Sequence, residues 1–499
     1  MHQDVVIGVD IGTSACKAIA IDSEGRMLTQ SQAMYSPTSP RPGWFELDPN
    51  TFVDAFTTVI HDILKKVPAN RVEGIGLDGI SNSPILIDEK MKPLRPCILW
   101  MDGRGVEYIP LILRSLDVEG ITPTLPVTPL ITLVKLLWIK ENESEVWSST
   151  RYVLQPKDYV RMWLTNTVAT DPSDASVTMM FDSKTFGWAD YVERVFGIEL
   201  RKLPEIVTSY KIIGYTTENI AKQTGLPEGI PVTIGCADGV ADVLAAGLSR
   251  ESDSLIRLGT AGVFSLILDR YIPDGKRYYI FAHVEPGRWV IQRMFPFGIP
   301  HRWFLKTFYN RELEYAESKG LDPYAYIENM LLTDIERVEN EMEELVFIPN
   351  IKLFEDPASF LGVFAGIGSM HTKIHLMLAL LQGLACATRE TVDIVSQKLG
   401  LAIDRIRLVG GGSKSTLIRR MIASLLNARV ETVKYHDASI GAAILSTVGI
   451  GMHRSFEEAI NNFIVLDQTV EPDEHLQASL PKVYEKYLRF RRALNTHVL

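Results

Sequence analysis

The feature that most constrains the fold is a pair of similar segments placed half a chain apart. VVIGVDIGTSACKAIAID at 5–22 and SDSLIRLGTAGVFSLILD at 252–269 each contain two apolar stretches separated by Gly-Thr, which is typical of a hairpin. The two segments align without a gap, so that Gly12 falls on Gly259. Self-similarity at a fixed offset predicts a duplicated domain. The alternative is coincidence, since Gly-Thr turns are common in hairpins.

Apolar and alternating stretches predict strands that are interleaved with helices. The predicted strands are 5–9, 17–21, 74–77, 85–87, 231–234, 255–258, 264–268 and 406–409. The predicted helices are 51–66, 130–139, 375–399 and 417–427. This alternation indicates an α/β protein. The 499 residues suffice for at least two hydrophobic cores, and the repeat divides them into domains at 1–247 and 248–499.

The composition excludes several classes of protein. The net charge is −10, and no run rich in Lys and Arg contains interleaved aromatic residues, so a nucleic-acid surface is not expected. The longest apolar stretch, 376–387, is interrupted by Gln382 and Gly383 and is too short to cross a bilayer. The first residues do not resemble a signal peptide. We therefore expect a cytoplasmic protein that binds no membrane.

The cysteines and histidines do not indicate a disulfide framework or a metal centre. The four cysteines contain no Cys-x-x-Cys pair, and we predict buried thiols at Cys16, Cys97, Cys236 and Cys386. His371 and His375 are the only helix-spaced pair of histidines, and no carboxylate shares their face. This pair is better explained as the start of a helix.

The two Gly-Thr turns carry residues suited to binding a polyphosphate. Glycine lets the backbone approach a ligand closely, and successive N–H groups of a turn can form a nest for an anion. The candidate residues are Gly12, Thr13, Ser14, Gly259 and Thr260. Two such nests facing each other would hold a polyphosphate from both sides. The alternative is that Thr13 and Ser14 only close a turn.

Charged residues flank the first of these turns. Asp10 lies too close to the predicted anion to act without a cation, so a bound Mg²⁺ is the simplest explanation of its charge. Lys17 follows Ser14 on the return strand, where its ammonium group would neutralise a phosphate oxygen. The alternative for Lys17 is a solvated side chain.

Eight motifs in order resemble the FGGY family of carbohydrate kinases, part of the superfamily of sugar kinases, heat-shock chaperones and actin. They are GVDIGTSACKA (8–18), WFELDP (44–49), ILWMDGRG (98–105), KDYVRMWLTNTVATDPSDAS (157–176), GCADGVADVLAAG (235–247), RLGTAGVF (257–264), LVGGGSKSTLIRRMIASLL (408–426) and DASIGAA (437–443). The resemblance covers nearly the whole chain. It implies two actin-like (ribonuclease H-like) ATPase domains that flank a deep cleft, with ATP and Mg²⁺ at its base and the sugar mainly on the N-terminal domain.

The family pattern implies that Asp238, the carboxylate of the Asp-Gly pair, is the general base. Phosphoryl transfer requires a group within hydrogen-bond reach of the attacking hydroxyl. A carboxylate at a helix N-terminus suits this role, because the helix dipole keeps it ionised. The alternative is an N-cap aspartate. Asp242, one turn later, is expected on the helix surface or in a supporting position.

Three consecutive glycines follow the predicted strand 406–409. The segment is not a P-loop, because Lys414 does not have the required spacing. Three glycines allow a flat group to lie against the backbone at a helix N-terminus. By resemblance this group is the adenosine, and its residues are Gly410, Gly411, Gly412 and Ser413. The alternative is a plain strand-to-helix turn.

An aromatic ring, an acceptor and a multidentate donor occur together at Trp100, Asp102 and Arg104. A sugar presents one apolar face and many hydroxyls, so this combination predicts substrate binding. The alternative is that Asp102 and Arg104 pair with each other on a surface loop. Trp44, in the motif 44–49, is expected to be structural.

The sequence departs from the family at two places. Where xylulose kinases place Gln-Met-His-Gly and glycerol kinases Arg-Glu, this chain has Ser81-Asn82-Ser83, so Asn82 takes the place of a substrate ligand. The usual Gly-Glu-Arg-x-Pro loop is altered at 350–357 and lacks its arginine, although Gly362 and Gly366 match the glycines that follow it. These departures predict a divergent subfamily.

The sequence predicts ATP-dependent phosphorylation of a primary hydroxyl of a small sugar. Candidate substrates are a ketose such as xylulose, a polyol or an aldonate such as gluconate, with a xylulose-like ketose slightly favoured. The alternative is a catalytically weak relative that binds sugar and nucleotide as a sensor. A chaperone-type ATPase is not expected, because the sequence shows no long β-rich segment after the second lobe. A homodimer is left open.

Overall fold

The computed structural model describes residues 4–497, apart from 124, 343 and 352–359. These residues form two compact units. The first unit comprises 1–251, 267–291 and 435–465, and the second comprises 252–266, 292–434 and 466–499. The chain first passes between the units close to the expected boundary after residue 247. The later segments 267–291 and 435–465 also belong to the first unit, so a single boundary does not describe the division of the chain.

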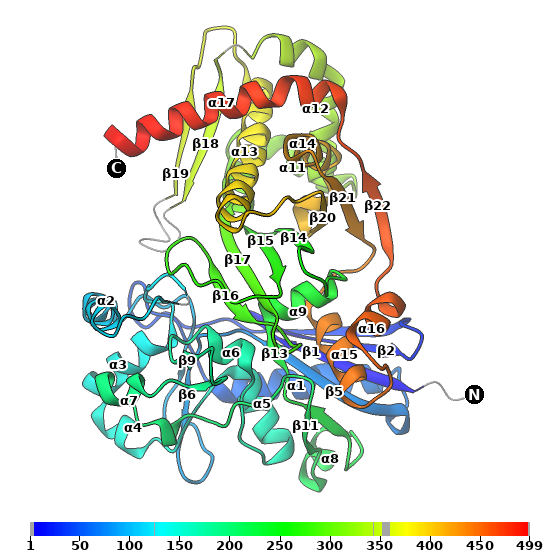
Figure 1. The fold of residues 1–499 in the computed structure, drawn as a ribbon. Helices are drawn as coiled ribbons and strands as arrows, with labels where there is room; N and C mark the ends of the chain where they lie inside the picture. The colour runs from blue at the N-terminus through cyan, green and yellow to red at the C-terminus, as the bar shows by residue number, and fades with distance from the viewer. Residues whose placement is uncertain (1–3, 124, 343, 352–359, 498–499) are drawn as a thin grey trace. The chain divides into compact units, whose positions relative to one another are not determined.

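A mixed sheet forms the centre of the first unit (Figure 1), with strand order β11-β12-β5-β1-β2-β3 and β13 beside β5. Its strands are β1 (Val5–Ile11), β2 (Ala15–Asp22), β3 (Met27–Met34), β5 (Val72–Gly79), β11 (Ile212–Tyr215), β12 (Pro231–Thr233) and β13 (Cys236–Ala237). β1 is antiparallel to β2 and parallel to β5. Its residues 5–9 are fully buried, and a strand covered on both faces is expected to be apolar nearly throughout.

Helices cover both faces of β1. Ile7 and Val9 share one hydrophobic cluster with Phe52 and Phe56 of α1 (Pro49–Leu64). Gly8 alternates with them and faces α15 (Ala438–Gly449), where an added Cβ would lie 1.9 Å from the carbonyl oxygen of Ser439. Only glycine permits this close approach. Asp10 has the same parity as Gly8, so its side chain lies on the α15 face of the sheet.

The sheet of the second half has the order β16-β17-β15-β14-β20-β21-β22. Its strands are β14 (Ser254–Leu258), β15 (Ala261–Leu268), β16 (Tyr279–Ala282), β17 (Trp289–Pro296), β20 (Arg405–Val409), β21 (Arg429–Val433) and β22 (Leu466–Val470). In both sheets an antiparallel hairpin is followed by two parallel strands and then an antiparallel one. The predicted duplication is therefore confirmed at the level of topology.

The two hairpins differ in register by one residue. Ile11 pairs with Cys16 in the first hairpin, whereas Leu258 pairs with Gly262 in the second. The alignment of the sequences would instead pair Leu258 with Val263. The second turn is one residue shorter, so the similarity of the sequences does not extend to the pairing.

The expected helices are present, with bounds that differ by up to three residues. They include α3 (Thr132–Asn142), α13 (Lys373–Leu399) and α14 (Thr416–Leu426). α1 begins earlier than expected because the Asp48 side chain accepts a hydrogen bond from the Asn50 N–H. His375 forms a capping box with Thr372 at the start of α13, which confirms its predicted place at a helix start.

All four cysteines are buried free thiols, as predicted. Of the helices described, none combines the length and apolar character needed to cross a membrane.

Candidate functional site

Three carboxylates of the first unit meet at the ends of adjacent strands. Asp10 near the end of β1 pairs in register with Asp78 of β5. Asp78 in turn pairs with Cys236 of β13, which leads directly into Asp238, the first residue of α9 (Asp238–Ala245). β5 runs parallel to both neighbours, and ligand sites of α/β sheets lie outside the carboxyl ends of such strands. Figure 1 shows β1, β5, β13 and α9 side by side.

Asp238 is held by a buried polar network behind β13. The Ala237 N–H donates a hydrogen bond to Ser173 Oγ (2.8 Å), and Ser173 Oγ donates to Asp171. Asp171 also lies 3.0 Å from the ammonium group of Lys157, whose side chain is fully buried. The Asp238 carboxylate accepts a hydrogen bond from the N–H of the next residue, Gly239, at 2.7 Å. The start of α9 is thus combined with a buried polar support for the backbone before it.

Ionisation of all three carboxylates would accumulate negative charge in a buried place. Burial and the nearby carboxylates of Asp437 and Asp238 raise the pKa of Asp10 to about 8. Burial, followed by the charges of Asp10 and Asp238, also raises the pKa of Asp78 well above its usual value. Both oxygens of Asp78 are buried and lack a hydrogen-bond partner among the described residues. A cation beside Asp10 and Asp78 would relieve this accumulation of charge.

Lys17 is paired with a carboxylate from the far end of the sequence. Its ammonium group lies 2.7 Å from Asp437, the N-cap residue of α15. Burial alone would lower the pKa of Lys17, but the hydrogen bond and charge of Asp437 outweigh it and raise the pKa. Because 39% of the Lys17 side chain is exposed, the pairing with Asp437 is compatible with the solvated alternative. The predicted contact of Lys17 with a phosphate stays a prediction.

The first Gly-Thr turn is braced by aromatic residues. The Gly12 N–H donates to the Ala15 carbonyl (3.0 Å), and the Tyr35 hydroxyl donates to the Gly12 carbonyl (2.6 Å). The indole N–H of Trp100 donates to Thr13 Oγ1 at 2.9 Å. Ser14 is exposed. Both oxygens of Asp10 lie 3.8 Å from where a Cβ of Gly12 would be, so this carboxylate adjoins the turn.

The second unit contains a pocket of about 570 Å³ lined by four of the predicted nucleotide residues. These are Gly259, Thr260, Gly411 and Gly412. Phe297, His301 of α10 (Gly298–Phe308), and Tyr324 and Glu328 of α12 (Pro323–Asn340) complete much of the wall. The volume lies in the range of small-molecule and cofactor sites.

Two of the predicted nucleotide residues, Gly410 and Ser413, do not line this pocket. Gly410 has a φ of +87°, and an added Cβ would lie 2.8 Å from the Leu258 carbonyl oxygen. The Ser413 hydroxyl donates to the Gly410 carbonyl (2.7 Å). In the structure both residues shape the turn, while Gly411 and Gly412 face the pocket.

His301 lines the pocket but was not predicted from the sequence. Burial lowers its pKa to about 4, so the ring is neutral at pH 7. Its buried Nε2 has no hydrogen-bond partner among the described residues. The ring packs edge-to-face against Tyr324, with centroids 5.6 Å apart. A neutral imidazole with a vacant ring nitrogen suits the polar edge of a flat ligand.

Replacing Gly412 by valine is expected to block this pocket. An added Cβ would lie 2.4 Å from the ring of Phe297, which is itself buried. The resulting strain should weaken ADP binding by roughly 10- to 100-fold. Calorimetric titration with ADP measures this loss. Gly411→Ala is the matched comparison, because its Cβ meets nothing within 4 Å; an equal loss in both variants would contradict the steric explanation.

Asp102 and Arg104 form hydrogen bonds with each other, and Arg104 also binds Glu46. Arg104 donates to both oxygens of Asp102 and, at 2.8 Å, to Glu46. Its guanidinium stacks 3.9 Å from the centroid of Trp44, which confirms a structural role for Trp44. The alternative expectation was that Asp102 and Arg104 pair with each other on a surface loop. The pairing is confirmed, but Asp102 is fully buried and does not lie on the surface. Their predicted contact with substrate remains untested.

Asn82 also uses its side chain within the protein. Its Oδ1 accepts hydrogen bonds from the backbone N–H and the hydroxyl of Thr132, both at 2.9 Å, at the start of α3. Its backbone is left-handed, with a φ of +55°, a conformation that asparagine tolerates better than most residues. The amide nitrogen of Asn82 is the part of the side chain that could still contact a substrate.

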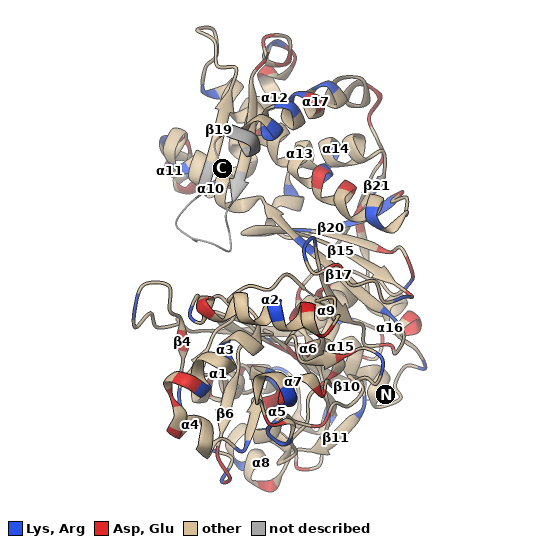
Figure 2. Cartoon of the chain, turned by 60° about the vertical axis from the view of Figure 1, so that its left-hand side comes forward, with Lys and Arg blue, Asp and Glu red and all other residues tan. Residues whose placement is uncertain are grey.

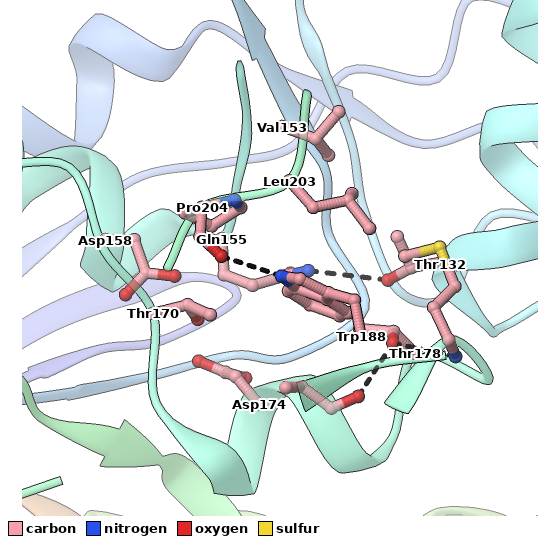
Figure 3. A pocket seen from close by; sticks show the side chains of 12 residues that line it. Thr132, Val153, Gln155, Asp158, Thr170, Asp174, Thr178, Trp188, Leu203 and Pro204 are labelled. Carbon is pink, nitrogen blue, oxygen red and sulfur yellow. Dashed lines mark hydrogen bonds between the residues drawn. The ribbon is translucent and has the colours of Figure 1, made fainter. Parts of the chain in front are cut away.

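A cavity close to Asn82 is too small to be the substrate site. Thr132, Gln155, Asp158 and Asp174 contribute to its wall, and Figure 3 shows the hydrogen bond from Gln155 to Thr132 across from the two carboxylates. Its volume of about 10 Å³ suits one water molecule and excludes a sugar.

The remaining predictions concern metals, charge and the altered loop. Among the described residues no group of three or more His, Cys, Asp or Glu side chains is arranged to hold a metal ion by itself.

Lys and Arg occur together with Asp and Glu on the elements of both units (Figure 2). Residues 352–357 of the altered loop lie outside the described residues.

The repeated sheet and the carboxylates at its strand ends define an actin-like ATPase fold, a class to which many sugar kinases belong. The chain belongs to the FGGY family of carbohydrate kinases: the model of the family's N-terminal domain matches residues 5–245, and that of its C-terminal domain matches 256–450. It is therefore a carbohydrate kinase, an enzyme that transfers a phosphoryl group to a sugar hydroxyl, and the family uses ATP.

The relatives that this chain matches are named for two different substrates, xylulose and gluconate. The chain is 30% identical to a xylulose kinase of Lactococcus lactis, over 92% of this chain and 90% of that protein. It is 28% identical to a gluconokinase of Bacillus subtilis, over 99% of each chain. The crystal structure of xylulose kinase from Rhodospirillum rubrum has a TM-score of 0.88 and 25% identity, with 99% of both chains covered.

Sequence reasoning missed three residues of these sites. Asp78 directly follows the predicted strand 74–77, so its position at a carboxyl strand end was a usable signal. Asp437 begins the DASIGAA motif, but its pairing with Lys17 across 420 positions leaves no local signal. Nothing in the sequence around His301 distinguishes it from an ordinary residue of a helix.

Proposed function

We propose that this kinase transfers the γ-phosphoryl group of ATP to a primary hydroxyl of a small sugar, with Asp238 as the general base. The observation that carries the proposal is the meeting of Asp10, Asp78 and Asp238 at adjacent strand ends, beside the turn at Gly12. A loose phosphoryl-transfer transition state requires positioning and electrostatic stabilisation rather than covalent chemistry. This arrangement supplies a base and a glycine turn side by side.

The roles of the other residues follow from their chemistry. In the first unit, the turn at Gly12–Ser14 binds phosphate oxygens of the nucleotide through the N–H groups of Thr13 and Ser14, because the Gly12 N–H already donates to Ala15. In the second unit, Gly259 and Thr260 line the nucleotide pocket. The adenosine occupies the pocket at Gly411 and Gly412, where Nε2 of His301 contacts the base. Asp238 accepts the proton of the sugar hydroxyl as that oxygen attacks phosphorus.

The carboxylates fit a Mg²⁺ ion that enters with the nucleotide. Burial and neighbouring carboxylates raise the pKa values of Asp10 and Asp78, so a divalent cation beside them would stabilise their ionised forms. Mg²⁺ usually binds through one or two carboxylates, substrate phosphates and waters, so a three-residue cage is not required. When bound, the ion would neutralise phosphate charge; Asp10 would hold it through water.

A neutral ketose, such as xylulose, is the substrate that we place first. The relatives named xylulose kinase and gluconokinase have nearly equal identity to this chain, so their names do not decide the question. An aldonate would bring a carboxylate that needs a cation, but Arg104, the cation among the predicted substrate residues, is already bound to Asp102 and Glu46. A neutral sugar needs no such partner.

A coupled ADP assay tests the proposal. The enzyme is incubated with ATP and Mg²⁺ and a panel of pentuloses, hexuloses, polyols and aldonates. We expect one ketose to raise ADP release at least about tenfold above the sugar-independent background, because the acceptor hydroxyl completes the transition state. If no sugar raises the rate although sugar and nucleotide both bind, the chain is a sensor instead.

A further inference from the structure

A hydrogen bond joins the phosphate turn to the segment predicted to bind sugar. The indole N–H of Trp100 donates to Thr13 Oγ1 at 2.9 Å, and both side chains are only partly exposed. Both residues belong to the first unit. Thr13 lies in the Gly-Thr turn, and Trp100 opens the stretch that also contains Asp102 and Arg104. The two predicted subsites are therefore in direct contact.

Trp100 is fixed at its backbone as well as at its ring. Its N–H donates to Ser83 Oγ (2.9 Å), and its carbonyl accepts from the ammonium group of Lys135 (3.3 Å). Ser83 and Lys135 are fully buried. Lys135 also donates to the carbonyls of Pro129 and Leu130, so Trp100 has little freedom to move independently of this support.

The support is built from the segment in which the sequence departs from its family. Ser83 receives a hydrogen bond at Oγ from Trp100 and donates its own N–H to Gln155 (2.9 Å). Gln155 in turn donates to Thr132 (Figure 3). Thr132, at the start of α3, donates through its N–H and its hydroxyl to Asn82. The departing residues thus position Trp100 through buried polar contacts.

The direction of the hydrogen bond determines what Thr13 can do. An indole nitrogen donates and never accepts, so Thr13 Oγ1 must accept from Trp100. A hydroxyl has one donor and two acceptor sites, and the accepted bond leaves the hydroxyl hydrogen available for another acceptor. A phosphoryl oxygen beside the turn is such an acceptor.

We propose that Trp100 is a positioning residue that orients the Thr13 hydroxyl to donate to a phosphate oxygen of the nucleotide, and so couples the sugar-side segment to the phosphate turn. The inference rests on the proposed function, since it assigns Thr13 to the phosphates. Its consequence is that Trp100 contributes to nucleotide binding and turnover through Thr13, without touching the nucleotide itself.

A double-mutant cycle between the two positions tests this coupling. Trp100→Phe keeps an aromatic ring and removes the N–H, and Thr13→Val keeps the shape and removes the hydroxyl. In the wild-type background we expect Trp100→Phe to weaken binding of a non-hydrolysable ATP analogue with Mg²⁺ by about tenfold. In the Thr13→Val background the same change should cost less than about twofold.

Thr13→Ser is the matched control, because serine retains a hydroxyl that can accept from the indole. Trp100→Phe should again cost about tenfold in this background. Thermal unfolding of every variant checks that the fold is retained. Equal losses in the wild-type, Thr13→Val and Thr13→Ser backgrounds would overturn the inference, since they would show that Trp100 acts only through packing.

Calorimetric binding and steady-state turnover are both measured for the cycle. A wild-type protein that binds the analogue without sugar-dependent ADP release would refute the proposed kinase activity, while the binding cycle would still decide the coupling. Active wild-type enzyme with additive losses would refute only the coupling. In turnover, the coupling predicts a larger change in KM for ATP than in KM for the sugar.

Discussion

Asp238→Asn is expected to lower kcat for sugar phosphorylation by about 10³-fold while leaving both substrates bound, because an amide cannot accept the proton of the attacking hydroxyl. Asparagine is close to isosteric, and the support of the backbone through Ala237 and Ser173 does not involve the carboxylate. Sugar-dependent ADP release gives kcat, and calorimetric titration with sugar and with ADP gives the binding.

Asp242→Asn is the matched control for Asp238. It lies one turn later on the same helix α9, is nearly buried, and has its Oδ1 3.9 Å from Nε2 of His436. We expect a loss of about tenfold or less, because Asp242 affects the site only through its charge. Undiminished turnover of Asp238→Asn, or an equal loss in both variants, would remove Asp238 from the role of base.

Arg104→Ala is expected to lower the free energy of unfolding by about 3–5 kcal/mol, because it leaves a buried carboxylate without its counter-charge. The guanidinium of Arg104 donates to both oxygens of Asp102, which also accept the backbone N–H groups of Phe45 and Arg104, and the exposed fraction of Asp102 is 0%. The change also removes the guanidinium that stacks on Trp44 and Trp138. Urea unfolding of the variant and wild type measures the difference.

Arg41→Ala is the control for this second prediction. Arg41 also stacks on Trp44, at 4.8 Å, but it is exposed, so its loss should cost less than about 1 kcal/mol. An Arg104→Ala variant with wild-type stability and a raised KM for the sugar would contradict a structural role. It would support the interpretation of Arg104 as a substrate ligand.

Much of the fold could be predicted from the sequence because its signals are local. The strand β1 is recognisable from an unbroken apolar run, and α13 from its long periodic pattern. The Gly-Thr repeat predicted two related sheets, and the sheets have the same order of strands. The one-residue difference in register could not be predicted, since β2 and β15 are buried on both faces and their apolar runs do not show which residues share a face.

The site was less predictable because its contacts join distant parts of the chain. The pairing of Asp102 with Arg104 could be expected from their spacing, but whether Arg104 faces a ligand or Glu46 depends on a segment 58 positions earlier. Asn82 was expected to contact substrate, and its Oδ1 instead holds Thr132. Hydrogen-bonding groups can be listed from a sequence, whereas their partners are set by packing.

The tight contact of Gly8 with α15 bears on how the polypeptide acquires its structure during synthesis. The helix that covers this face of β1 comprises residues 438–449, which leave the ribosome after most of the second unit. Until then the N-terminal strands expose an apolar face, the kind of surface that chaperones shield. A chain released before residue 437 would lack both this cover and the anionic partner of Lys17, and is expected to aggregate rather than persist as a folded N-terminal fragment.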